Sequence, residues 1–116
     1  MNMRPDEVIA LASDHAGFGL KQVIKERLET YGFGSLDLGP VDANSVDYPE
    51  FGGRLASAIC SGRAYCGVGI CGTGIGMSIV LNRTPGVRAA LCYNAEAAQL
   101  SRKHNDANIL VPFIKE

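Results

Sequence analysis

The sequence has 116 residues, which is enough for one domain with a single core and too few for two. Its 11 Lys and Arg against 12 Asp and Glu give a formal net charge of −1, so no broad attraction to nucleic acid or to an anionic membrane is expected. The start is polar, and the apolar run at residues 8–12 is too short for a signal-peptide core or a membrane span. We therefore expect a cytoplasmic protein with neither a nucleic-acid nor a membrane partner.

The first predicted element is a strand at residues 8–12, a continuous apolar run typical of strands buried on both faces. A helix over residues 18–31 follows, because apolar residues recur there at three- and four-residue spacing and Gly32 is placed to end it. Its inner face is predicted to hold Leu20, Val23, Ile24, Leu28 and Tyr31. Its outer face is predicted to hold Lys21, Lys25, Glu26 and Glu29.

The alternation of strands and helices continues along the chain. Further strands are predicted at residues 36–38, 67–70, 88–92 and 107–111. A second helix is predicted to begin at Pro49 and to turn Phe51, Leu55 and Ile59 inward. A third helix is predicted to follow a Gly-rich turn and to end at about Asn82. A fourth is predicted over residues 95–103, with Asn94 as its N-cap. Such alternation implies parallel strands joined by right-handed crossovers. The predicted fold class is α/β: a single-domain, doubly wound, Rossmann-like sheet of about five parallel strands with helices on both faces.

Ligands bind such sheets outside the carboxyl ends of the strands. Three polar clusters follow predicted strands there: Ser13-Asp14-His15, Cys71-Gly72-Thr73-Gly74 and Tyr93-Asn94. A fourth cluster, His104-Asn105-Asp106, lies between the last helix and the last strand, so we expect it at the opposite rim of its own subunit. If this cluster takes part in the chemistry, it acts in the site of a neighbouring subunit.

Residues 71–76 read Cys-Gly-Thr-Gly-Ile-Gly and join a buried strand to a helix. The glycines allow close approach of a ligand and turn several N–H groups toward one point, where the helix adds the positive end of its dipole. The turn is not the dinucleotide fingerprint, since its glycines follow the third strand as G-x-G-x-G, and no Gly-Lys-Ser/Thr follows as in a P-loop. It is expected to stabilise negative charge, with a purely structural turn as the alternative.

The four cysteines lack the C-x-x-C spacing of zinc or redox sites. Cys60, Cys66 and Cys92 fall in or beside apolar stretches, so we expect them to be buried and inert. Cys71 directly precedes the Gly-rich turn, whose N–H groups and helix dipole favour a thiolate that acts as base or nucleophile. The alternative is a small buried residue that ends a strand. No set of Cys, His and carboxylate residues has ligand spacing, so we predict neither a metal nor a cofactor.

Three other polar residues lie at positions where each is expected either to contact a ligand or to have a purely structural role. His15 should share its rim with Cys71, and Thr73 is expected either to bond a substrate oxygen or to cap the helix. Tyr48, between Asp47 and Pro49, is a pocket wall or an ordinary loop anchor.

Five motifs in this order cover about residues 8–110: Asp14-His15-Ala16-Gly17, Asp47-Tyr48-Pro49, Cys71-Gly72-Thr73-Gly74-Ile75-Gly76, Asn82 with Gly86-Val87-Arg88-Ala89, and Arg102-Lys103-His104-Asn105-Asp106-Ala107-Asn108. In this combination the chain resembles the ribose-5-phosphate isomerase type B family, which also includes the galactose-6-phosphate isomerase subunits. The resemblance implies a metal-free aldose–ketose isomerisation of a sugar phosphate through an enediolate. It also implies a homodimer, or a tetramer, whose sites are shared between subunits.

The resemblance further implies a role for each residue of the site. Cys71 would be the base, and Thr73 and His104, the latter from the partner chain, would assist ring opening. The backbone N–H groups from Gly72 through Gly74 and Ile75 to Gly76 would hold the enediolate oxygen. The remaining contacts would come from Asp14 and Tyr48 to sugar hydroxyls, from His15 near the phosphate, and from Asn105 near C1 to C3.

The chain departs from the family after Leu110. Family members continue through a Gly-x-Arg turn, whose arginine binds phosphate, and then a long helix, whereas here the sequence reads Val-Pro-Phe-Ile-Lys-Glu over residues 111–116. We therefore expect residues 1–116 to form one isomerase domain, shortened at its C-terminus relative to the family, with a raised KM. Arg88 and Lys115 are the candidates to replace the missing phosphate contact.

The leading hypothesis is interconversion of ribose 5-phosphate and ribulose 5-phosphate. One alternative is an isomerase of a six-carbon sugar phosphate, such as galactose 6-phosphate or allose 6-phosphate. The other is a sugar-phosphate-binding remnant with little turnover.

Overall fold

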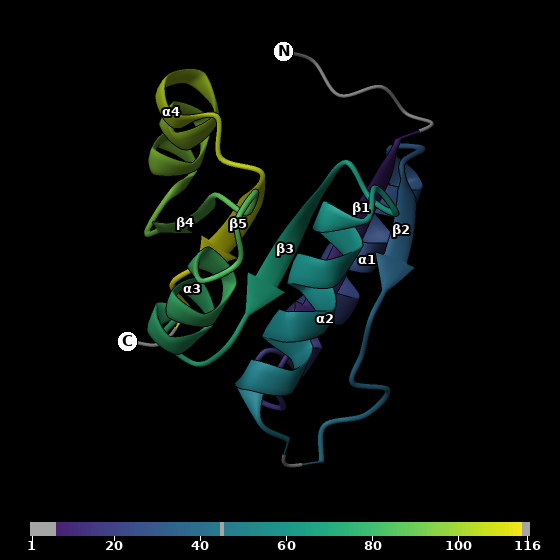
Figure 1. Cartoon of the computed structure of the whole chain (residues 1–116). Coiled ribbons are helices and arrows are strands. Elements are labelled where there is room, and N and C mark those ends of the chain that lie inside the picture. Colours follow the sequence, from purple (N-terminus) through teal and green to yellow (C-terminus); the bar gives the residue numbers. More distant parts are fainter. Residues whose placement is uncertain (1–6, 45, 115–116) are drawn as a thin grey trace.

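The computed structural model describes residues 7–44 and 46–114. Within these residues one five-stranded, all-parallel sheet has the order β2-β1-β3-β5-β4 (Figure 1). The strands are β1 (Val8–Ser13), β2 (Gly34–Asp37), β3 (Cys66–Ile70), β4 (Ala89–Cys92) and β5 (Ile109–Pro112). The helices are α1 (Phe18–Thr30), α2 (Tyr48–Cys60), α3 (Ile75–Asn82) and α4 (Ala95–Asn105). The predicted doubly wound α/β fold is confirmed, with element bounds shifted by at most two residues.

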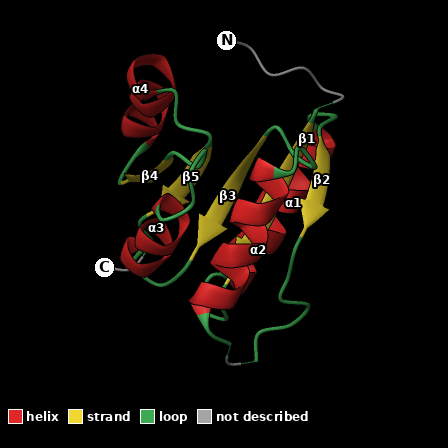
Figure 2. Ribbon diagram, viewed as in Figure 1, coloured by secondary structure: helices red, strands yellow, loops and turns green. Residues whose placement is uncertain are grey.

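The helices cover both faces of the sheet (Figure 2). α2 and α3 pack on one face, around a core that includes Leu55, Met77 and Leu81. α1 packs on the other face over Leu11 and Ile70. α4 lies on the α1 side, because residues of both helices line a cavity of ≈ 260 Å³ over β3 and β5. In the described part of the chain, the longest helices have 13 residues, and none combines the length and apolar character that a bilayer crossing needs.

The start of α1 is packed tightly against the end of β3. A Cβ atom on Gly17 would lie 2.4 Å from Ile70 Cγ2, so only glycine allows this approach. Gly32, with φ +85°, ends α1 as predicted, since the left-handed conformation costs glycine little. α1 therefore fixes the loop that follows β1 beside the loop that follows β3.

The structure corrects the predicted faces of α1. Lys21 is fully buried, whereas Val23 and Tyr31 are 54% and 64% exposed. The inward stripe runs through the buried Gly17 and Lys21 and the half-buried Ile24 and Leu28, at the four- and three-residue spacing of one helix face. The Lys21 side chain has polar partners at its end. A tertiary ion pair thus overrides the preference of lysine for solvent.

The prediction of buried cysteines is wrong for Cys60. It is the last residue of α2, and its exposed Sγ donates to the Pro85 carbonyl at 3.3 Å. Cys92 is buried as predicted, and Cys66 is partly buried. Phe51 and Leu55 are buried as expected, with Ile59 partly so.

Candidate active site

The loops after β1 and β3 meet at the carboxyl rim of the sheet. The Asp14 N–H donates to the Ile70 carbonyl at 3.0 Å, so Asp14 lies beside the residue that precedes Cys71. The Asp14 side chain is buried, and its Oδ1 accepts from the Gly17 N–H at 3.1 Å. The placement of Asp14 and Cys71 at one rim, predicted from strand order alone, is confirmed.

Cys71 receives a hydrogen bond from the turn that follows it. The Gly74 N–H donates to Cys71 Sγ at 3.2 Å, and the side chain is 5% exposed. Gly74 directly precedes α3 with φ +85°, and a Cβ there would lie 2.6 Å from Leu91 Cδ1. A backbone donor aimed at sulfur stabilises a thiolate more than a thiol, since hydrogen bonds to charged groups are the stronger ones.

The rest of the turn offers further N–H groups. The Ile75 N–H, from the first residue of α3, donates to Thr73 Oγ1 at 3.2 Å, while the N-cap position itself is taken by Gly74. No described residue accepts a hydrogen bond from the N–H of Gly72 or of Gly76. These two groups lie beside Cys71 at a helix N-terminus, where an anionic oxygen is stabilised.

Tyr48 covers this turn from α2. A Cβ placed on Gly76 would lie 2.6–2.9 Å from atoms of the Tyr48 ring and its hydroxyl, so the ring rests directly on the Gly76 backbone. Tyr48 is the first residue of α2 and remains 37% exposed. The N-termini of α2 and α3 therefore meet at the same rim as Cys71.

His15 is exposed and is held by the backbone of Val46. The Val46 N–H donates to His15 Nδ1 at 3.2 Å, and the Val46 carbonyl oxygen lies 3.3 Å from the same nitrogen. A neutral ring can accept from the N–H with its own proton on Nε2, and a protonated ring can donate to the carbonyl. Either way, Nε2 is left to bind a ligand.

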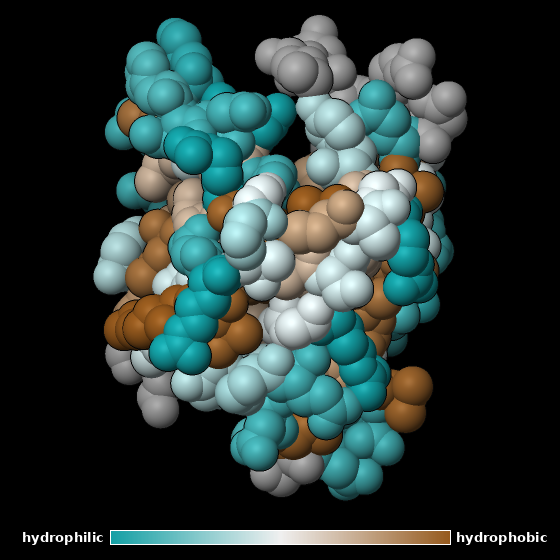
Figure 3. All heavy atoms as spheres, viewed as in Figure 1, coloured by the Kyte–Doolittle hydropathy of each residue, from teal (hydrophilic) through white to brown (hydrophobic). Residues whose placement is uncertain are grey.

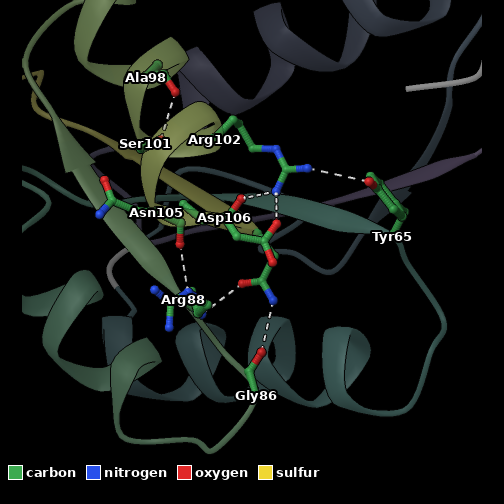
Figure 4. Close-up of polar contacts among 10 residues, drawn as sticks. Tyr65, Gly86, Arg88, Ala98, Ser101, Arg102, Asn105 and Asp106 are labelled. Carbon is green, nitrogen blue, oxygen red and sulfur yellow. Dashed lines mark hydrogen bonds and ion pairs between the residues drawn. The ribbon is translucent and has the colours of Figure 1, made fainter. Parts of the chain in front are cut away.

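His104 and Asn105 lie at the opposite, amino rim, as predicted. Arg88, which precedes β4, donates from Nε to the Asn105 carbonyl at 2.8 Å (Figure 4). Arg102 reaches Tyr65, just before β3, with 3.4 Å between Nη2 and the hydroxyl. Within one chain, the sheet separates His104, Asn105 and Arg88 from the Cys71 turn. Lys115, the other candidate for phosphate, lies outside the described residues.

Sequence reasoning missed Lys21 and Asp37. Lys21 Nζ lies 2.7 Å from Asp37 Oδ1, directly under the loop that leads to Val46 and Tyr48. The signal that could have found the pair is a lysine inside the apolar stripe of a helix, since a buried ammonium requires a partner. Among the described residues, no group of three His, Cys, Asp or Glu side chains gathers closely enough to hold a metal ion.

The chain is similar to known proteins over most of its length. A family profile described as "Ribose/Galactose Isomerase" matches residues 9–112. The chain belongs to the ribose/galactose isomerase family. A family member from Escherichia coli K12, ribose-5-phosphate isomerase B, is 42% identical over 102 residues, which cover 88% of this chain and 68% of that protein.

Solved structures of the family agree with the fold. Ribose-5-phosphate isomerase B from Clostridium thermocellum superimposes with a TM-score of 0.88 at 47% identity, covering 94% of this chain and 72% of that one. The Thermotoga maritima enzyme gives a TM-score of 0.89 at 47% identity, with coverage of 91% and 73%. The backbone that carries Cys71 and Asp14 therefore has the same fold as these solved structures of the family.

Proposed function

We propose that this chain is an aldose–ketose isomerase that interconverts ribose 5-phosphate and ribulose 5-phosphate. The observation that carries the proposal is the hydrogen bond from the Gly74 N–H to Cys71 Sγ, beside N–H groups without an acceptor in the described chain. Family membership supports the reaction class, and the names of the compared relatives support the five-carbon substrate. The whole of residues 1–116 would act as one isomerase domain in the cytoplasm.

The chemistry requires one base and one oxyanion site. The Cys71 thiolate removes the proton from C2 of the open-chain aldose, and the C–H electrons form a C1=C2 double bond while O1 becomes negative. The N–H groups of Gly72 and Gly76 stabilise that enediolate oxygen at the N-terminus of α3. Transfer of the O2 proton to O1, and return of the abstracted proton from the Cys71 thiol to C1, then give the ketose with its C2=O bond and regenerate the thiolate. Base and oxyanion donors thus come from one turn.

The sugar and its phosphate would extend from this turn toward β1. Asp14 keeps one carboxylate oxygen that accepts from sugar hydroxyls, since Oδ1 is used by Gly17. Tyr48 presents its exposed hydroxyl over Gly76. His15, held through Nδ1 by Val46, offers Nε2 to the phosphate. These three groups account for binding at one end of the substrate.

Ring opening would draw on a second copy of the chain. His104 and Asn105 are exposed at the amino rim, where their own Cys71 is out of reach. An apolar surface over α3 includes Ile75 and Ile79, which are 48% and 53% exposed (Figure 3). Exposed apolar side chains next to a site favour association with another chain. We expect a homodimer, or a tetramer of such dimers, in which His104 of one copy and Thr73 of the other assist ring opening.

The test is conversion of ribose 5-phosphate by the purified chain, with galactose 6-phosphate and allose 6-phosphate assayed separately as alternative substrates. Ribulose 5-phosphate formation with a higher kcat/KM than for either hexose phosphate is the expected result. Preference for a hexose phosphate would move the assignment to six-carbon substrates. Binding of ribose 5-phosphate without turnover would indicate a sugar-phosphate-binding protein instead.

A further inference from the structure

The ammonium group of Lys21 is fully buried under the carboxyl end of β2. Its Nζ donates to Asp37 Oδ1 at 2.7 Å, to the Pro40 carbonyl at 3.1 Å and to Gln22 Oε1 at 3.2 Å. Three donors and three acceptors satisfy the ammonium completely. Such a group stays charged in a protein interior only where its partners are fixed, so the contacts hold two segments together, α1 and the chain after β2.

The chain after β2 is the β2–α2 loop, residues 38–47, and both of its ends reach the candidate site. At its start, the Gly39 N–H donates to Asp37 Oδ1 at 2.9 Å, and the Gly39 carbonyl accepts from the Ser13 N–H at 3.2 Å. At its end, Val46 holds His15, and Tyr48 follows. The ion pair of Lys21 is thus connected through Gly39 to the residue before Asp14.

Between these ends, the described residues 41–44 are all exposed. A hollow of ≈ 870 Å³ lies between the loop and α2, lined by loop residues and by Phe51 and Arg54 of α2. Val41 is 92% exposed at the middle of the loop. Since residues 41–44 are exposed to solvent, the position of the loop depends on the anchors at its two ends.

Two exposed cations lie near the same loop and serve as comparisons. Lys25 is 3.5 Å from Asp37 Oδ2 and 36% exposed. Arg54 donates to the Leu38 carbonyl at 3.1 Å and is 50% exposed, with Glu50 as its ion partner. Exposed pairs of this kind are screened by water and are individually weak. Lys21 is the buried anchor.

We infer that Lys21 is a positioning residue of the sugar-phosphate site: its buried contacts with Asp37 and Pro40 set the β2–α2 loop so that Val46 orients His15 and Tyr48 covers Gly76. The inference rests on the proposed function for its kinetic consequence alone. Loss of the anchor would loosen substrate contacts while leaving Cys71 and its donors in place. The expected result is a rise in KM without a matching fall in kcat.

The experiment compares Lys21→Met with Lys25→Met. Lys25 lies on the same helix and pairs with the same carboxylate, that of Asp37, so its replacement also removes one positive charge beside Asp37. Two quantities are measured in each folded variant: KM and kcat for ribose 5-phosphate, and the ring ¹⁵N shifts of His15 at alkaline pH. His104, the other of the two histidines, is the internal reference. Lys21→Met should raise KM by roughly 10-fold or more, change kcat by less, and shift His15 Nδ1 toward the value of a free imidazole. Lys25→Met should leave both readouts near wild type.

Lys21→Met combined with Asp37→Asn replaces the single variant if that variant does not fold, since it leaves no buried charge unpaired. The same KM rise and His15 shift are expected. A folded variant with wild-type KM or an unmoved His15 signal overturns the inference. If the wild-type chain does not convert ribose 5-phosphate, the proposed function fails, and the His15 signal by itself decides whether Lys21 sets the loop.

Discussion

One cysteine begins β3 and another directly follows it, and the two sulfur atoms differ in their surroundings. At the amino end, burial raises the pKa of Cys66 to about 11, with a nearby Arg102 lowering it and Glu7 raising it further. At the carboxyl end, Cys71 follows the strand, and its Sγ accepts the Gly74 N–H. Cys66 is therefore a neutral thiol at physiological pH, whereas the sulfur of Cys71 has a backbone N–H donor directed at it.

The difference comes from what the chain does after each cysteine. Cys66 enters a strand, so its neighbouring N–H groups are used by the sheet ladder. Cys71 leaves the strand into a turn that begins a helix, where N–H groups lack intrahelical acceptors. Parallel strands create this asymmetry, because every strand of such a sheet ends at the same rim.

The largest expected effect comes from deleting the sulfur at one end only. Cys71→Ala should lower kcat by about 10²–10⁴-fold, the usual contribution of a general base, while substrate binding and folding persist. Cys66→Ala is the matched control and should retain activity. Kinetics with ribose 5-phosphate check both, and comparable losses in the two variants would break the comparison.

The amino rim can be tested by complementation between subunits. His104→Ala and Cys71→Ala should each be nearly inactive alone, whereas refolding the two together should restore about a quarter of the wild-type activity, because half of the random dimers contain one intact site. The measurement is activity of the co-refolded mixture against each variant refolded separately. Absence of recovery would mean that His104 does not act in the site of a partner.

The contact of the Tyr48 ring with the Cys71 turn can be tested by replacing two helical glycines with alanine, one beneath the ring and one away from it. Gly76→Ala should raise KM by roughly 10-fold, because a Cβ would lie 2.6 Å from the Tyr48 ring and displace it. Gly53→Ala on α2 is the control, since a Cβ there has no atom within 4 Å. Alanine should stabilise that helix by up to about 1 kcal/mol without affecting KM. Thermal melts and kinetics on both variants separate packing from binding.

Asp37 gives a smaller effect that depends on pH. Burial alone would raise its pKa, but the Lys21 and Gly39 hydrogen bonds and the charges of Lys21 and Lys25 together lower it. A lowered pKa stabilises the fold above the unfolded value of about 3.9, and this contribution is lost as the pH falls through the folded value. The stability difference between wild type and Asp37→Asn, from thermal melts, should therefore be largest above about pH 5 and shrink below pH 4. A difference constant across that range would contradict the pairing.

Metal removal should have the smallest effect. The proposed base and oxyanion donors are a thiolate and backbone N–H groups, so exhaustive chelation should leave the rate of ribose 5-phosphate conversion unchanged. If activity is lost with the chelator and fully restored by one divalent ion, the proposal is contradicted. The control is the same chelator treatment of Cys71→Ala, whose residual rate should also be unaffected.

The sequence by itself determined the α/β class, the strands and helices that the described residues form, and the rim on which each polar cluster lies. Periodicity and the order of elements suffice for this, because parallel strands place all their carboxyl ends together. The positions of Asp14 beside Cys71 and of His104 at the other rim follow from chain order alone.

Only the tertiary structure decided which side chains are partners. Lys21 reads as a solvent-facing lysine, yet it is buried because Asp37, 16 residues away, and the Pro40 carbonyl meet it across the β2 end. The Gly74 N–H reaches Cys71 Sγ because Gly74 adopts a left-handed conformation that Leu91 and Val111 pack against. Such contacts depend on distances between segments remote in sequence. A local pattern indicates which face a residue occupies but cannot specify what it meets there.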